Sequence, residues 1–338
     1  MKVLFIGGNG NISWWCVEYA IKQGYVVYEL NRSMTRKTRR SVQSQVHEII
    51  ADIRDYDTVA AALSDIHFDV VCDFICFNEE QAKQAVKLFS GKVDQYIVIS
   101  SEAVYQRKSE FLPFREDTPQ YDETVEDAYI AGKIQVEKVF KEAFRIQGFP
   151  VTIVRPGYTY DTIIQVPVGQ NCFTAPQRFL EGYPLIMLGD GENLVAPLHS
   201  KDFAKGFVGL IGNNAAIGEE YHIAGEQLIT WNEMAAVILT ALEEDAGNII
   251  HIPRDEALNI TDFYSKIVNH QHMWHYIFDN TKIKSAVPGW KQKISFSEGM
   301  KETVEWLLED TVRQRINSEY DRKLEKIYSK YWNGGNVD

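Results

Sequence analysis

The 338-residue chain contains only four cysteines, and no two of them form a CxxC pair. This excludes a dense disulfide framework and gives no support for a zinc site built on paired cysteines. We therefore expect free, mostly buried thiols in a reducing compartment at Cys16, Cys72, Cys76 and Cys172.

An excess of positive charge is also lacking. The chain has 35 Lys and Arg against 47 Asp and Glu, which gives a formal net charge of -12 at pH 7. Because binding nucleic-acid phosphates requires basic surface, this balance argues against a dedicated nucleic-acid-binding protein.

Long apolar runs are absent as well. The first apolar stretch covers only residues 3–6 before glycines follow, which is too short for a signal peptide. No stretch approaches the roughly 18 apolar residues of a membrane span. We expect a soluble, cytoplasmic protein without a membrane partner.

The chain opens with MKVLFIGGNGNIS, which indicates a nucleotide-binding turn. Residues 2–6 are typical of a buried strand, SWWCVEYAIKQG has helical spacing, and YVVYEL is typical of a second strand. In this context Gly7 permits the tight turn, Gly10 lets backbone N–H groups approach a pyrophosphate, and Ser13 is the third small residue. The helix N-terminus then faces the negative charge.

The end of the second strand selects between cofactors. It carries no acid to hold a ribose 2′-OH, and Asn31 is followed by Arg32, which could accommodate a 2′-phosphate. The sequence therefore slightly favours NADP over NAD. The basic residues at 37–40 are interpreted as a solvated loop or helix face, and Asp52 and Ile53 as contacts of the adenine.

Alternating strand and helix patterns continue through the first half of the chain. We expect strands at 49–55, 68–77, 94–101 and 151–157 and helices at 58–66, 79–89 and 127–148. This predicts an α/β fold with a Rossmann-type, doubly wound parallel sheet. Residues 1–160 form the NAD(P)-binding domain. Residues 161–338 form mostly a smaller substrate-binding lobe, interleaved with the end of the sheet, with helices at 200–213, 229–247 and 295–332.

The residues most indicative of chemistry are Tyr129 and Lys133 in YIAGK, which share one face of a helix. A tyrosine with a pKa near ~10 is a poor base, and a nearby ammonium lowers that pKa. Alone, such a pair is most simply a surface pair. Here VISSEAVY precedes it as a strand ending at Ser101, and VRPG follows it as another strand end.

Together GGNGNIS, SSEAVY, YIAGK, RPG and HSKDFAKG resemble the extended short-chain dehydrogenases/reductases of the NAD-dependent epimerase/dehydratase group. The resemblance implies that Tyr129 is the general acid/base, that Lys133 binds the nicotinamide ribose, and that Ser101 orients the reacting oxygen. Glu102 would be a second acid/base, or simply a loop carboxylate. Cofactor contacts would include Gly7, Gly10, Asn11, Ile12 and Pro156.

The chain departs from the family pattern in one informative place. Many nucleotide-sugar members have an arginine shortly after the GDG turn, where this chain has Val195, and another arginine such as Arg178 would have to substitute. This variant resembles the atypical branch that includes chloroplast stem-loop RNA-binding proteins. We expect an epimerase, dehydratase or reductase acting on a sugar-like hydroxyl or ketone, with a nucleotide sugar as substrate. The alternative is a non-catalytic cofactor-sensing or RNA-binding module.

Two further patterns carry weaker expectations. His270, His272 and His275 fit neither one helical face nor one strand face, so we expect aromatic packing or a substrate contact rather than a metal site. The resemblance also implies a homodimer. The helix with Val136, Val139, Phe140 and Phe144 is a candidate interface, and the alternative is that this stripe belongs to the core.

Overall fold

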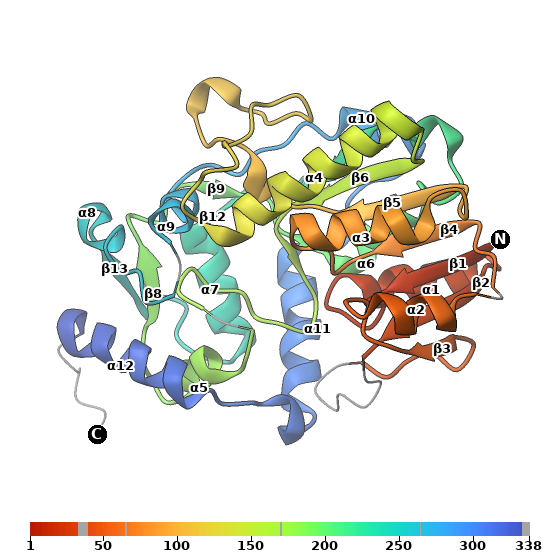
Figure 1. Cartoon of the computed structure of the whole chain (residues 1–338). Coiled ribbons are helices and arrows are strands. Elements are labelled where there is room, and N and C mark those ends of the chain that lie inside the picture. The colour runs from red at the N-terminus through yellow and green to blue at the C-terminus, as the bar shows by residue number, and fades with distance from the viewer. Residues whose placement is uncertain (33–39, 65, 170, 264, 333–338) are drawn as a thin grey trace.

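The computed structural model describes residues 1–32, 40–64, 66–169, 171–263 and 265–332. In this part of the chain, seven parallel strands form the central sheet in the order β11-β6-β5-β4-β1-β2-β3 (Figure 1). The Rossmann-type parallel sheet is thus confirmed. Its strands are β1 (Lys2–Ile6), β2 (Val26–Asn31), β3 (His47–Ile50), β4 (Val70–Asp73), β5 (Gln95–Ile99), β6 (Val151–Pro156) and β11 (Glu220–Ile223).

Helices cover both faces of the sheet, because successive side chains of each strand point to opposite sides. Val3 and Phe5 pack in one apolar cluster with residues of α1 (Ser13–Lys22) and α6 (Ser200–Val208). Leu4 and Ile6 pack in another with residues of the helices on the second face. Those helices are α2 (Tyr56–Ala62), α3 (Glu79–Phe89) and α4 (Ala128–Gln147), and Figure 1 shows α3 and α4 side by side.

A third apolar cluster lies beyond the carboxyl edge of the sheet and forms the core of a smaller lobe. Its short strands pair as β7 (Thr159–Tyr160) with β10 (Leu198–His199), β8 (Leu185–Leu188) with β13 (Ile249–Ile252), and β9 (Leu194–Val195) with β12 (Ile229–Thr230). The remaining helices are α5 (Thr174–Leu180), α7 (Trp231–Ala241), α8 (Arg254–Ala257), α9 (Lys266–His272), α10 (Thr281–Ala286), α11 (Phe296–Leu308) and α12 (Ser318–Tyr331). Four 3-10 turns cover Glu102–Val104, Ser109–Phe111, Asn214–Ala216 and Thr311–Arg313.

Several expected elements are shorter, shifted or divided. The strand expected over residues 49–55 is β3 at His47–Ile50, and the helix expected over residues 200–213 ends at Val208. The strand expected over residues 68–77 ends at Asp73, whose carboxylate accepts the Ile75 N–H at 2.9 Å and turns the chain out of the sheet. The helix expected over residues 295–332 is two helices, because Asp310 caps a 3-10 turn after α11 and Asn317 caps α12. Thr230 caps α7 in a capping box with Glu233.

Two expectations from the composition can be compared with the structure. Cys16, Cys72 and Cys76 are buried, Cys172 is half-buried, and all four are free thiols. Within the described ranges, no helix combines the length and the apolar character that crossing a bilayer requires.

Candidate functional site

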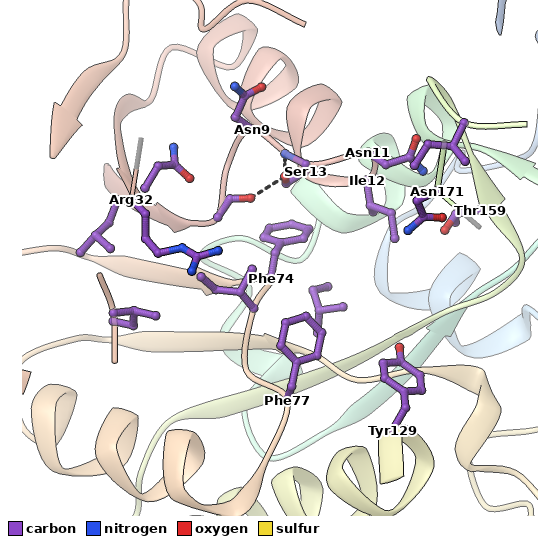
Figure 2. A pocket seen from close by; sticks show the side chains of 18 of the residues that line it. Asn9, Asn11, Ile12, Ser13, Arg32, Phe74, Phe77, Tyr129, Thr159 and Asn171 are labelled. Atoms are coloured by element: carbon purple, nitrogen blue, oxygen red, sulfur yellow. Dashed lines mark hydrogen bonds between the residues drawn. The ribbon is translucent and has the colours of Figure 1, made fainter. Parts of the chain in front are cut away.

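A cavity of about 590 Å³ opens at the carboxyl edge of the sheet, where ligands bind in such folds (Figure 2). It brings together eight of the residues predicted from the sequence: Gly7, Gly10, Asn11, Ile12, Asn31, Arg32, Ile53 and Tyr129. Five predicted residues are not part of its lining: Asp52, Ser101, Glu102, Lys133 and Pro156. Lining residues that the sequence analysis missed include Asn9, which lies within GGNGNIS. They also include Phe74, Phe77, Thr159 and Asn171, which belong to no recognised motif.

The glycine turn is closed by Ser13. Its hydroxyl donates to the Gly7 carbonyl oxygen at 2.7 Å and accepts the Gly10 N–H at 2.7 Å (Figure 2). Ser13 therefore does more than provide a small side chain, because its hydroxyl hydrogen-bonds to both ends of the turn. The Gly10 N–H is used within the turn, so a bound pyrophosphate would meet the rest of the turn and the first residues of α1. Gly7 has a φ of 77°, as the expected tight turn requires.

The end of β2 lies at one side of the cavity. Asn31 and Arg32 line it, while residues 33–39, which include Arg36, Lys37 and Arg39, lie outside the described part of the chain. Arg40 was expected on a solvated face, and this is wrong. Its guanidinium pairs with Asp161 at 2.8 Å and lies over the ring of Trp306, because the loop before β3 reaches the smaller lobe.

The two residues expected at the adenine behave differently. Ile53 lines the cavity, whereas Asp52 does not. The Asp52 carboxylate accepts hydrogen bonds from Arg54, which lower its pKa to about 2. This pairing holds Asp52 against its own loop.

Tyr129 is placed by the N-terminus of α4. Asp127 caps the helix by accepting the N–H groups of Tyr129 and Ile130, both at 3.0 Å. The Tyr129 ring points into the cavity and the residue is 47% exposed (Figure 2). Partial burial raises the pKa of Tyr129 above its usual value, and the neighbouring Ser101 hydroxyl acts in the opposite direction.

Lys133 lies one helical turn further along α4 and is buried. Its ammonium donates to the carbonyl oxygens of Cys76 and Ile99, both at 2.8 Å, and lies 4.4 Å from the centre of the Phe77 ring. Burial lowers the pKa of Lys133 to about 8. The two carbonyl groups use two of its three donors and fix the ammonium behind Tyr129.

Gly132 brings α4 against the loop after β4. A Cβ at this position would collide with the Phe77 carbonyl oxygen, so only glycine allows the approach. The glycine of YIAGK therefore sets the distance over which Lys133 reaches the backbone of this loop.

Glu102 follows Ser101 in a 3-10 turn and is buried. Its carboxylate pairs with the buried Arg107, whose guanidinium lies 4.8 Å from the ring centre of Phe114 and 4.2 Å from that of Tyr276. Arg107 is a partner that the sequence analysis did not foresee. A role for Glu102 in proton transfer stays a prediction.

Pro156, expected as a cofactor contact, does not line the cavity. Pro156 ends β6 and is buried in the sheet, while Thr159 of β7 lines the cavity. His199, which pairs with Tyr160 in the register of β10 and β7, is buried and accepts the Lys201 N–H as the cap of α6.

The position of the missing family arginine is apolar. Val195 is buried in β9, which pairs with β12. Arg178, the expected substitute, is held within the lobe by Asp321 at 2.7 Å and Glu325 at 3.1 Å.

Another arginine lies closer to the cavity. Arg315, in the connection between α11 and α12, lines two smaller cavities of about 450 and 180 Å³. Asn171 lines both of these and the main cavity, so the three meet at one residue. No motif surrounds Arg315, and the sequence offered no signal for it.

The three clustered histidines occupy separate surroundings. His275 accepts the Leu194 N–H at 3.0 Å, and the His270 ring stacks near Trp274. The His272 ring lies against Trp231, and burial together with Arg107 lowers its pKa to about 4. These contacts are the aromatic packing that the sequence analysis expected.

The apolar side chains of α4 lie partly in the core and partly at the surface. Val136 and Phe140 are fully buried against the sheet with Val139 beside them, so these belong to the core. Phe144 is 40% exposed near the end of the helix.

Comparison with known proteins agrees with this geometry. Residues 3–224 match the model of the NAD dependent epimerase/dehydratase family. The chain is 27% identical to the chloroplast stem-loop binding protein of 41 kDa b from Arabidopsis thaliana, over 88% of this chain and 77% of that protein. It is 24% identical to a dTDP-glucose 4,6-dehydratase from Haemophilus influenzae, over 91% of this chain and 98% of that protein.

Among solved structures, a UDP-glucuronic acid 4-epimerase from Bacillus cereus, in complex with UDP-glucuronic acid and NAD, superposes with a TM-score of 0.70. The two chains are 18% identical, and the match covers 91% of this chain and 99% of that one. The fold is therefore shared over nearly the whole length. The chain belongs to the NAD-dependent epimerase/dehydratase family, a group of enzymes of the short-chain dehydrogenase/reductase type.

Proposed function

We propose that the protein is an NAD(P)-dependent epimerase, dehydratase or reductase that acts on a hydroxyl or ketone of a nucleotide sugar, with Tyr129 as general acid/base. The observation that carries this proposal is the arrangement of three side chains. Tyr129 points into the cavity beside the glycine turn, Ser101 lies near enough to lower its pKa, and the Lys133 ammonium is fixed behind its ring.

The cavity suits a dinucleotide. Its glycine turn and the N-terminus of α1 lie where a pyrophosphate binds in such folds, with Ile53 at one end and Tyr129 at the other. We assign the adenosine to the Ile53 end and the nicotinamide to the Tyr129 end. Arg32 lines the adenosine end, which supports the slight preference for NADP.

The bound nicotinamide would supply the hydride chemistry, and the protein's residues would handle the proton. The Tyr129 phenolate takes the proton of the substrate hydroxyl while the Ser101 hydroxyl holds the same oxygen. Because partial burial raises its pKa, Tyr129 alone stays protonated at neutral pH and is therefore a poor base. Lys133, which is mostly protonated below its pKa of about 8, stabilises the phenolate electrostatically.

The substrate class is carried over from the relatives. A dTDP-glucose 4,6-dehydratase and a UDP-glucuronic acid 4-epimerase are named for nucleotide sugars. In this chain, we assign the substrate phosphates to Arg315, since it lines the two cavities that adjoin the main one at Asn171. A bidentate guanidinium is well suited to phosphate.

We also propose a cellular compartment and an oligomeric state. Four free thiols fit a reducing compartment such as the cytoplasm. We retain the homodimer, with the exposed Phe144 and Ile146 at the end of α4 as its contact. The same residues give a direct test, because a Phe144→Ser and Ile146→Ser double variant should be monomeric in sedimentation.

Tyr129→Phe tests the catalytic assignment. The purified protein is denatured and its released nucleotides are identified by mass spectrometry. Wild type and variant are then assayed with UDP- and dTDP-sugars and both nicotinamide cofactors. We expect the variant to bind cofactor normally and to lose at least ~100-fold in turnover. Unchanged turnover would remove Tyr129 from the mechanism. A protein that binds no dinucleotide would contradict both the enzyme and a cofactor sensor, and would favour an RNA-binding module.

A further inference from the structure

A separate cavity, of about 360 Å³, lies at the amino edge of the sheet, beside the residue that precedes β2. It is formed where α1 ends, where α6 ends and where the chain runs from α10 towards α11. The glycine turn lies at the other end of α1, which has 10 residues and is therefore about 15 Å long. This cavity is thus distinct from the candidate active site, and the proposed reaction gives it no role.

The lining of this cavity combines cations with aromatic rings. Its charged side chains are Lys205, Lys291 and Lys293, and none of the described residues that line it is acidic. Its aromatic side chains are Tyr19, Tyr25 and Trp290. The chain as a whole has a formal net charge of -12, so a cavity that carries cations alone indicates a site for an anion.

One buried carboxylate organises the wall of the cavity. Asp202 is fully buried, and one of its oxygens accepts the Lys205 ammonium at 2.7 Å. The other oxygen accepts the backbone N–H groups of Lys293 and Ile294 at 2.7 and 2.8 Å. The Trp290 indole N–H donates to the Asp202 carbonyl oxygen at 2.9 Å. The wall is therefore fixed before any ligand binds.

The two exposed lysines lie on either side of an anchored residue. Gln292 is turned into the protein, where its amide donates to the Pro197 carbonyl oxygen at 3.1 Å and accepts the Gln227 N–H at 3.0 Å. Lys291 and Lys293 line the cavity, and neither forms an ion pair with another described residue. Because Asp202 neutralises Lys205, two unpaired positive charges remain in the cavity.

We propose that this cavity binds a nucleoside monophosphate, with the phosphate between Lys291 and Lys293 and the base against Tyr25. A phosphate monoester carries about −1.5 to −2 charges at neutral pH, which matches the two unpaired lysines. The half-buried Tyr25 offers a ring on which a base can stack. The volume also fits, since the cavity of about 590 Å³ is assigned to a dinucleotide and this one has about 360 Å³. The inference goes beyond the proposed function and does not depend on it.

The charges around the cavity favour a small molecule over a nucleic acid. Lys22, at the end of α1, pairs with Glu18 at 2.9 Å, and Lys284 of α10 pairs with Glu226. The positive charge therefore does not continue into the basic track that a nucleic-acid backbone requires.

The test is a calorimetric titration of AMP into protein saturated with NADP and UDP, which fill the cofactor and substrate cavities. We expect AMP to bind wild type at a further site. The double variant Lys291→Gln and Lys293→Gln should bind AMP about 10- to 100-fold more weakly, since each lysine supplies a charge-assisted hydrogen bond. Tyr25→Leu should weaken AMP binding about fivefold or more and leave the binding of inorganic phosphate unchanged.

The matched control is the double variant Lys83→Gln and Lys87→Gln, which removes the same charge from exposed positions of α3 and should bind AMP as wild type does. Equal AMP affinity in wild type and in the Lys291 and Lys293 double variant would overturn the inference, as would a loaded wild type that binds no AMP. Inorganic phosphate bound as tightly as AMP would refute the nucleoside.

Two further outcomes separate this inference from its neighbours. Single-stranded RNA that binds more tightly than AMP, and depends on the same two lysines, would overturn the assignment to a small molecule. A protein that binds neither NADP nor UDP would contradict the proposed function. The difference in AMP affinity between wild type and the Lys291 and Lys293 double variant would still decide this inference.

Discussion

The Lys133 ammonium lies 5.8 Å from the centre of the Tyr129 ring. It is held there by the backbone carbonyl groups of Cys76 and Ile99. These carbonyl groups follow β4 and end β5, so the position of the charge depends on the sheet itself. The arrangement buries a cation, which lowers the free energy of unfolding, and this effect can be measured.

Lys133 should impose a characteristic pH dependence on stability. Its pKa is about 8 when folded and near 10.5 when unfolded, so the unfolded chain binds more protons between these values. Stability should therefore rise with pH in this window, by about 3 kcal/mol relative to Lys133→Met. Urea unfolding from pH 7 to 10 measures this, with Lys83→Met on the exposed face of α3 as the control. Parallel profiles for wild type and Lys133→Met would show that Lys133 does not titrate in this range.

Gly132→Ala should disturb the site without touching a catalytic group. The added methyl group collides with the Phe77 carbonyl oxygen, so α4 must move away from the loop after β4. We expect a loss of about 1–3 kcal/mol in unfolding free energy, together with lower turnover because Tyr129 and Lys133 move with the helix. Glu142→Ala, at an exposed position of the same helix, should change neither. Full turnover in Gly132→Ala would mean that the close approach does not position the pair.

Ser13 should matter for its hydroxyl rather than for its size. Ser13→Ala and Ser13→Gly both remove the two hydrogen bonds that close the turn. We expect each to raise the NAD dissociation constant about 3- to 30-fold, since each bond contributes about 1 kcal/mol. Fluorescence titration with NAD measures the effect. Wild-type affinity in Ser13→Gly would show that a small residue is all that the turn needs.

Arg315→Gln tests the assignment of the substrate phosphates. The variant should bind UDP and dTDP about 10- to 100-fold more weakly in the cofactor-loaded protein, while uridine and NAD bind as before. Arg322→Gln, at an exposed position of α12, is the matched control. Equal losses for NAD and UDP would place Arg315 at the cofactor, and unchanged UDP binding would remove it from the substrate site.

The sequence predicted the elements whose signals are local. The strand at Lys2–Ile6 and the helix at Glu79–Phe89 agree with the expected ranges, because apolar periodicity, glycines and caps mark their ends. The strand expected over residues 68–77 was too long because an apolar run carries no information about where hydrogen bonding to neighbours stops. That limit depends on the Asp73 carboxylate turning back to Ile75.

The site was predictable to the same extent. Tyr129, Asn31 and the glycine turn could each be predicted, because each lies within a short local motif. The partners of Lys133 are backbone atoms, which no side-chain pattern reveals. The pair of Arg40 and Asp161 and the position of Arg315 join segments far apart in the chain, and only the packing of the smaller lobe brings them together.

The order of the strands has a consequence for synthesis on the ribosome. Strand β6 ends at Pro156, but its outer neighbour β11 begins only at Glu220. A ribosome that adds about 5–20 residues per second needs roughly 3–12 s to make the segment between them. During that time the backbone of β6 has no partner on one side, and such an edge can pair with another nascent chain. The speed of translation through residues 157–219 therefore influences how much of the protein reaches its native state.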